Sequence, residues 1–228
     1  MSILCAFSLD SGFSYLPTQT VLKIFITACI YLSMVNIDYA QNKEMNMGFY
    51  SPDFINIDKL YFYDVPNRQK ISGQETPIDS LTFGKDQYNN YALLSAPTWF
   101  QPIHDKLDYA IFYLKLKRLG RDYFEVIVNE TTGKTAYVSR ESGQAILWPE
   151  FLLNIHSVEF ISDTQKVFDN PNIKSAGRSY DRPFFRSRYI EGDWMEVEIL
   201  DDDFKVIGRG WIRWKENGKL LINYNLLS

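Results

Sequence analysis

The chain is poor in the residues on which many enzymes and metal sites depend. It has 228 residues, yet only 2 cysteines and 2 histidines. Both cysteines, Cys5 and Cys29, precede the cleavage site that we predict after Ala40, so the mature chain would contain none. This excludes disulfides, thiolate metal sites and cysteine nucleophiles from the mature protein. A zinc site would need both histidines together with carboxylates, and we expect no metal and no cofactor.

Other signatures of catalysis and of polyanion binding are also missing. The sequence has no glycine-rich phosphate loop and no Gly-x-Ser-x-Gly nucleophile elbow. Its net charge of -4 gives no electrostatic reason to expect nucleic acid or an anionic membrane surface as a partner. We therefore predict that the protein is not an enzyme and contains no catalytic residues.

A long hydrophobic run occurs near the N-terminus, where Lys23 precedes the apolar stretch Ile24–Leu32. This stretch has the length of a signal peptide and is too short to span a bilayer. We predict a signal peptide over residues 1–40, export to the periplasm or cell envelope, and no membrane span in the mature chain. Because the first twenty residues lack a basic residue, translation is expected to start near Val21 or Leu22.

Two alternatives for this N-terminal segment stay open. The apolar stretch could instead be an N-terminal helix that is buried or associated with a membrane. The residues Ile26–Cys29 also resemble a lipoprotein signal, in which Cys29 would be acylated, although the apolar run continues beyond the cysteine.

Short β-type runs separated by turn residues dominate the rest of the sequence. Aromatic residues make up 16% of the chain and favour strands. Residues 41–57 are interpreted as a lead-in and residues 68–90 as a long loop, and no stretch demands a long helix. Asn217-Gly218 predicts a hairpin, since both residues readily adopt positive φ. The fold class is therefore predicted to be mainly β. The clearest predicted strands cover residues 60–63, 110–117, 123–128, 193–199 and 210–214.

Four blocks occur twice in the same order, which predicts an internal repeat. The first repeat is expected at 58–153, with a long insertion, and the second at 162–228. The matched blocks are residues 63–67 with 168–172, 122–126 with 193–197, 137–138 with 211–212, and 143–147 with 218–222.

A repeat of this size and strand order resembles the bacterial SH3-like domain. The residues that carry the resemblance are Val167–Pro171, Trp194–Ile199 and Gly210–Ile212; the first repeat matches less well, because Tyr137 replaces the tryptophan. With its leader, the chain resembles exported proteins of the Bacteroidetes that carry tandem SH3-like repeats. The resemblance implies two small β-barrels in tandem after an N-terminal signal segment, acting as a binding or scaffolding module of the cell envelope.

Three pairs of residues are candidates for ligand binding. Trp99 and Phe100 lie in an irregular, proline-bounded segment, where they either bind a partner or cover an open end of the barrel. Trp211 and Trp214 lie three residues apart, so a regular strand places them on opposite faces. One is expected in the core, and the other either offers an aromatic platform to a peptide or sugar or packs as well, in the core or against the other repeat. Arg186 and Arg188, in the expected long loop of the second repeat, could meet an anionic ligand or be solvated.

The remaining polar residues have structural interpretations. His104 and His156 are expected to be surface or structural residues, and Asp201-Asp202-Asp203 to be a hairpin turn. We expect an exported, non-enzymatic module that recognises a peptide, glycan or protein partner. Two alternatives are a carboxylate-dependent envelope hydrolase and a structural subunit of a larger assembly.

Overall fold

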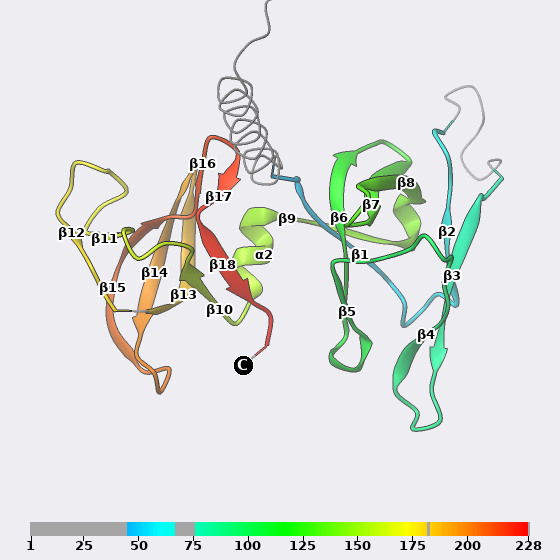
Figure 1. The fold of residues 1–228 in the computed structure, drawn as a ribbon, viewed down its shortest axis with the longest axis horizontal. Helices are drawn as coiled ribbons and strands as arrows, with labels where there is room; N and C mark the ends of the chain where they lie inside the picture. Colours follow the sequence, from blue (N-terminus) through cyan, green and yellow to red (C-terminus); the bar gives the residue numbers. More distant parts are fainter. Residues whose placement is uncertain (1–44, 67–75, 182, 228) are drawn as a thin grey trace, which may run out of the picture. The chain divides into compact units, whose positions relative to one another are not determined.

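The computed structural model describes residues 45–66, 76–181 and 183–227 (Figure 1). The predicted signal peptide, its cleavage site and Cys29 lie outside the described residues. Within the described part, no helix is long and apolar enough to cross a membrane. Residues from Met45 onward form one compact unit.

The structure is mainly β and contains a sheet that curls into a half-barrel. The described residues contain one α-helix, α2 (Trp148–Asn154), and two short 3-10 helices, Leu107–Tyr109 and Arg140–Ser142. The strands are β1 (Gly48–Pro52), β2 (Lys59–Phe62), β3 (Asp79–Lys85), β4 (Tyr91–Ser95), β5 (His104–Lys106), β6 (Ile111–Leu119), β7 (Tyr123–Asn129), β8 (Lys134–Ser139), β9 (Gly143–Leu147), β10 (Ser157–Phe160), β11 (Val167–Phe168), β12 (Gly177–Arg178), β13 (Phe184–Glu191), β14 (Trp194–Leu200), β15 (Val206–Arg213), β16 (Lys215–Glu216), β17 (Lys219–Leu220) and β18 (Ile222–Asn225).

Two large antiparallel sheets organise these strands. The first sheet has the order β8-β7-β6-β1-β9, with β5 added beside β6. The second has the order β12-β11-β15-β14-β13-β10-β18. Smaller sheets are formed by β2-β3-β4 and by the hairpin β16-β17.

Five strands of each sheet follow one plan. In chain order these strands are β1, β6, β7, β8 and β9 in the first sheet, and β10, β13, β14, β15 and β18 in the second. Numbered in that way, both sheets have the order 4-3-2-1-5. An additional segment meets the fourth strand at matching points. Tyr63 bridges Tyr137 in the first sheet, and Phe168 pairs with Trp211 in the second.

A β-bulge occupies the same place in both sheets. The pairing of β6 with β7 skips Lys117, between Leu116 and Arg118. The pairing of β13 with β14 skips Arg188, between Ser187 and Tyr189. A bulge adds one residue to a strand and re-aims its side chain. In both sheets the extra residue is a cation.

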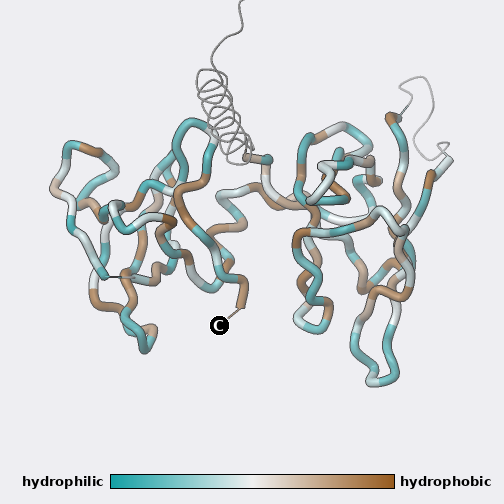
Figure 2. Tube along the Cα trace, viewed as in Figure 1, coloured by the Kyte–Doolittle hydropathy of each residue, from teal (hydrophilic) through white to brown (hydrophobic). Residues whose placement is uncertain are grey.

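Two hydrophobic cores lie against these sheets, and β1 contributes to both. The first core contains Tyr50 together with side chains of β2, β3, β6, β7 and β8. The second contains Phe49 with side chains of α2, β10, β13, β14 and β15. Because successive strand residues point to opposite sides, the adjacent Phe49 and Tyr50 are both fully buried, one in each core. Figure 2 shows hydrophobic and hydrophilic residues following one another along the strands.

Several predicted elements are confirmed. The strands expected around residues 60–63, 110–117, 123–128, 193–199 and 210–214 are present. Asn217 and Gly218 have φ angles of 49° and 73°, as a tight hairpin turn requires. The carboxylate of Asp201 accepts from the backbone N–H groups of Asp203 and Lys205, which makes this segment the expected turn.

Other expectations were wrong. Residues 48–52 of the expected lead-in form β1, and residues 79–85 of the expected long loop form β3. Arg186 and Arg188 lie on β13 rather than in a loop.

Candidate functional site

Three arginines converge on one buried glutamate on the outer face of β13, β14 and β15, the face turned away from the second core. Glu198 of β14 lies between Arg186 and Arg209, its direct neighbours on the adjoining strands. The distances to its carboxylate oxygens are 3.4 Å from Arg186 Nη1, 3.1 Å from Arg209 Nη2 and 3.9 Å from Arg188 Nε. We call this surface, with the aromatic side chains described next, the second outer face.

The guanidinium groups shield the carboxylate from solvent. The side chain of Glu198 is 9% exposed, whereas those of the three arginines are 42–65% exposed. A ligand that approaches this face therefore meets guanidinium groups first. Guanidinium groups bind carboxylates and phosphates with paired hydrogen bonds.

Aromatic side chains continue the same face along the strands. Glu196 lies between Tyr189 and Trp211, whose rings meet edge to face at 6.2 Å. Trp194 meets Phe168 edge to face at 5.4 Å. Phe168, Trp194 and Trp211 are all half-buried, and Tyr189 is exposed. Tryptophan, tyrosine and arginine side chains are enriched among the residues that contribute most to binding at interfaces, so this face has the composition of a binding surface.

The first sheet presents a related surface, the first outer face, on β6, β7 and β8. Glu125 accepts a hydrogen bond of 2.7 Å from Lys117 Nζ and lies 3.4 Å from Arg118 Nε. Tyr137 donates a 3.4 Å hydrogen bond to the same carboxylate. Burial alone would raise the pKa of Glu125, but Lys117, Arg118 and Tyr137 together hold it below its ordinary value. Tyr63 and Tyr123 pack edge to face at 5.1 Å nearby.

Trp214, which the sequence analysis pairs with Trp211, belongs to the second core. Trp214 is 1% exposed, and its indole N–H donates to the backbone oxygen of Gly192 at 3.1 Å. The parity argument was therefore sound, since Trp211 lies on the outer face and Trp214 in the second core. Of the predicted residues, the structure brings Arg186, Arg188 and Trp211 together.

Trp99 and Phe100 pack against the first core. Both rings contact Phe62, at 5.4 and 5.7 Å between centroids. The ammonium of Lys134 lies 4.0 Å from the centre of the Trp99 ring and covers one side of it. Asn129 Nδ2 donates to the backbone oxygen of Trp99. These contacts favour the covering role over the ligand-binding one.

A surface cavity of about 420 Å³ lies beside the end of β1. Its lining includes two carboxylates, Asp53 and Glu141. Asn56 Nδ2 donates to both carboxylate oxygens of Asp53. Because two carboxylates line it, this cavity is the place to test the hydrolase alternative.

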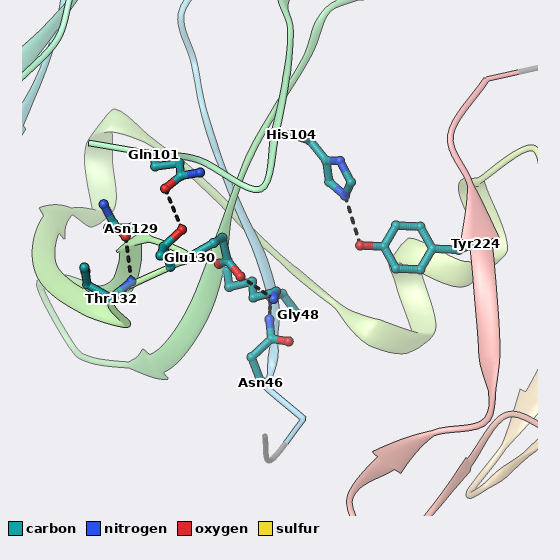
Figure 3. A network of polar contacts seen from close by, with 10 residues as sticks. Asn46, Gly48, Gln101, His104, Asn129, Glu130, Thr132 and Tyr224 are labelled. Atoms are coloured by element: carbon teal, nitrogen blue, oxygen red, sulfur yellow. Dashed lines mark hydrogen bonds and ion pairs between the residues drawn. The ribbon is translucent and has the colours of Figure 1, made fainter. Parts of the chain in front are cut away.

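His104 links the first sheet to the last strand (Figure 3). Its Nε2 lies 2.9 Å from the hydroxyl of Tyr224 on β18. Beside it, Lys115 Nζ contacts Glu130 Oε2 at 2.5 Å. Burial, assisted by the charge of Glu130, raises the pKa of Tyr224 to about 12, so this phenol keeps its proton. Burial and the charge of Lys115 lower the pKa of His104 below its ordinary value of 6.5, although Glu130 opposes this. The neutral ring can then accept a hydrogen bond from the Tyr224 hydroxyl.

The lowered pKa of His104 predicts that the folded protein loses stability in mild acid. Because its pKa is lower when folded than when unfolded, the unfolded chain binds more protons just below pH 6.5, and stability falls as the pH drops through that range. We expect denaturant titrations of the wild type at pH 7.5 and 5.5 to show a larger loss of stability than those of His104→Gln, which does not titrate. Equal losses in both proteins would contradict this assignment.

Comparisons with protein families, with curated proteins and with solved structures gave no match. The sequence reasoning identified Arg186, Arg188 and Trp211 but missed Glu198, Arg209 and the aromatic residues beside them. The alternation of Glu196 and Glu198 with the apolar Met195, Val197 and Ile199 was the available signal, since it places both carboxylates on one outer face of β14.

Proposed function

We propose that this chain is an exported, non-enzymatic binding module of the cell envelope, built from two SH3-like barrels in tandem. The leader sequence supports export. The common 4-3-2-1-5 strand order supports the tandem arrangement, as does the pairing of Tyr63 with Tyr137 and of Phe168 with Trp211. The partner is a peptide, glycan or protein.

The second outer face is the proposed binding surface. The observation that carries this proposal is the convergence of three exposed arginines on the single buried carboxylate of Glu198, beside Trp211. One carboxylate cannot satisfy all the donors of three guanidinium groups, because each has five N–H groups. Since the three side chains are 42–65% exposed, donors that Glu198 leaves unpaired are available to an anionic or hydroxyl-rich partner.

Arrays of defined peptides and glycans test this function. We expect the wild type to retain at least one ligand, and the double substitution Arg188→Ala/Arg209→Ala to weaken that ligand by about tenfold or more. Arg121→Ala is the matched control, since that arginine is 94% exposed and lies outside this face. Failure of every ligand to bind, or equal loss in the control, would refute the proposal.

The same arrays distinguish the proposed binding function from the hydrolase alternative. Cleavage of a retained glycan, lost in Asp53→Asn or Glu141→Gln and unaffected by the arginine substitutions, would replace the binding role with catalysis in the cavity beside β1.

A further inference from the structure

We infer that the second outer face binds a neutral, hydroxyl-rich glycan through the row of side chains centred on Glu196. The inference rests on the proposed binding function and names the ligand class. Its basis is a difference between two neighbouring rows of side chains on this face. In one row the carboxylate is hydrogen-bonded by its neighbours, and in the next row it is not.

The row that contains Glu198 is bonded within the protein. Arg186 Nη1 and Arg209 Nη2 each donate a hydrogen bond to the Glu198 carboxylate, at 3.4 and 3.1 Å. Both arginines are direct neighbours of Glu198 across the strand pairs. The protein itself therefore fixes the positions of these three side chains.

The next row along the strands lacks such contacts. Glu196 lies between Tyr189 and Trp211, its partners on β13 and β15. In the part of the chain that the structure describes, Glu196 makes no hydrogen bond and no ion pair, and its half-buried side chain keeps its carboxylate oxygens in contact with solvent. Among the same residues, the hydroxyl of Tyr189 and the indole N–H of Trp211 have no hydrogen-bond partner either. These three polar groups are therefore available to a ligand.

The β-bulge adds a cation to this row. Arg188 is the extra residue of the bulge and directly precedes Tyr189, the partner of Glu196. Its Nε lies 3.9 Å from Glu198 Oε1, which is too far for a hydrogen bond, and its side chain is 54% exposed. Within the described ranges Arg188 donates no hydrogen bond, so its guanidinium group is open next to the pair of Tyr189 and Glu196.

The first sheet shows how a carboxylate at this position is satisfied from within. Glu125 in β7 and Glu196 in β14 are both the third residue of their strand. Each pairs with an aromatic residue of the fourth strand, which is Tyr137 in the first sheet and Trp211 in the second. Glu125 is buried and accepts hydrogen bonds from Lys117 at 2.7 Å and from Tyr137 at 3.4 Å. In the second sheet a ligand can supply the donors that Lys117 and Tyr137 supply in the first.

The open groups fit a neutral sugar. Glu196 and Arg188 contribute one negative and one positive charge, so this row has no net preference for an anion or a cation. Neighbouring hydroxyls of a pyranose both donate and accept, and therefore match a carboxylate beside a guanidinium group. The flat C–H side of the sugar can pack on the rings of Tyr189 and Trp211, which meet edge to face at 6.2 Å.

An extended peptide fits this face less well. β14 is paired on one side with β13 and on the other with β15, so its backbone has no open edge to which a peptide strand could add. The row crosses three strands, a width of about 10 Å, which a short oligosaccharide can cover. Recognition here depends on side chains alone, and a sugar offers several hydroxyls to them over a small area.

Arrays of neutral, acidic and basic oligosaccharides, followed by calorimetry on the full mature chain, test the ligand class. We expect at least one neutral glycan to bind the wild type. Its affinity should change by less than about twofold between about 50 and 500 mM NaCl, because the ligand carries no charge for the salt to screen.

Single substitutions test whether the row centred on Glu196 is the site. Glu196→Gln keeps the size of the side chain but removes its charge, Arg188→Ala removes the guanidinium donors, and Trp211→Ala removes a ring. Each should weaken the neutral glycan by about tenfold or more, in protein whose melting curve shows that it is folded. Glu150→Gln is the matched control, since that side chain is exposed on α2, and it should leave the affinity unchanged.

Three results would overturn the inference. They are the absence of any bound neutral glycan, binding that requires a carboxylate or sulfate group on the ligand and weakens in salt, and a neutral glycan whose affinity is unchanged in Glu196→Gln and Trp211→Ala. Retention of an acidic glycan or an acidic peptide that depends on Arg188 and Arg209 would refute the neutral ligand class but leave the proposed binding function standing.

Discussion

Replacement of Phe49 by alanine is expected to lower the free energy of unfolding by about 3–5 kcal/mol, the usual cost of truncating a fully buried phenylalanine. The ring lies in the second core although its strand belongs to the first sheet. It contacts Phe151 at 4.3 Å, Trp148 at 5.0 Å, and Tyr113 and Tyr224 at 5.6 and 6.1 Å. Alanine would leave a cavity where β1, β6, α2 and β18 meet.

Chemical denaturation followed by far-UV circular dichroism and by tryptophan fluorescence measures this effect. Because Phe49 joins elements of both sheets, we expect the two transitions to shift together to lower denaturant concentration. Tyr109→Ala is the control, since this ring is 62% exposed, and it should change stability by about 0.5 kcal/mol or less. A loss below about 1 kcal/mol for Phe49→Ala, or separate shifts of the two signals, would show that the sheets are stabilised independently.

The strands that sequence reasoning identified are those with one buried face. In β14, the buried Met195, Val197 and Ile199 alternate with less buried residues, and this period of two is visible in the sequence. The turn at Asn217-Gly218 was predictable because its backbone conformation strongly favours those two residues.

Strands without such alternation were missed for physical reasons. In β1, Phe49 and Tyr50 are both buried, because this strand lies between two cores, so no period of two appears. In β13, the bulge at Arg188 shifts the alternation by one residue, and the inward positions run Phe185, Ser187 and then Ile190. A pattern with such a shift resembles an irregular segment, which is why the arginines were placed in a loop.

The candidate site depended on strand register, which the sequence does not reveal. Arg186 and Arg209 are 12 and 11 residues from Glu198 in the chain, and they become its neighbours only through the pairing of β13 and β15 with β14. The arginines on β13 were recognised as a cluster of like charge. The buried carboxylate that gathers them could be identified only when the strands were aligned.

The second prediction with a large expected effect concerns Trp214, which directly follows β15, in contrast to Trp211 within that strand. Trp214→Ala is expected to lower the free energy of unfolding by about 3–5 kcal/mol, since it empties a fully buried site in the second core. Trp214→Phe keeps most of the apolar volume but leaves the Gly192 carbonyl without its indole donor. We expect that change to cost about 1–3 kcal/mol.

Trp211→Ala provides the contrast, because the same residue type three positions earlier lies on the outer face. We expect it to cost about 1 kcal/mol or less, since the half-buried ring is already in contact with water. Thermal melts compare all three variants: for a chain of this size each kcal/mol shifts the midpoint by roughly 2–4 °C, so Trp214→Ala should melt at least ~6 °C lower than the wild type. Similar midpoints for Trp211→Ala and Trp214→Ala would mean that both rings are part of the core. The second outer face would then lack the exposed aromatic ring that the proposed binding surface requires.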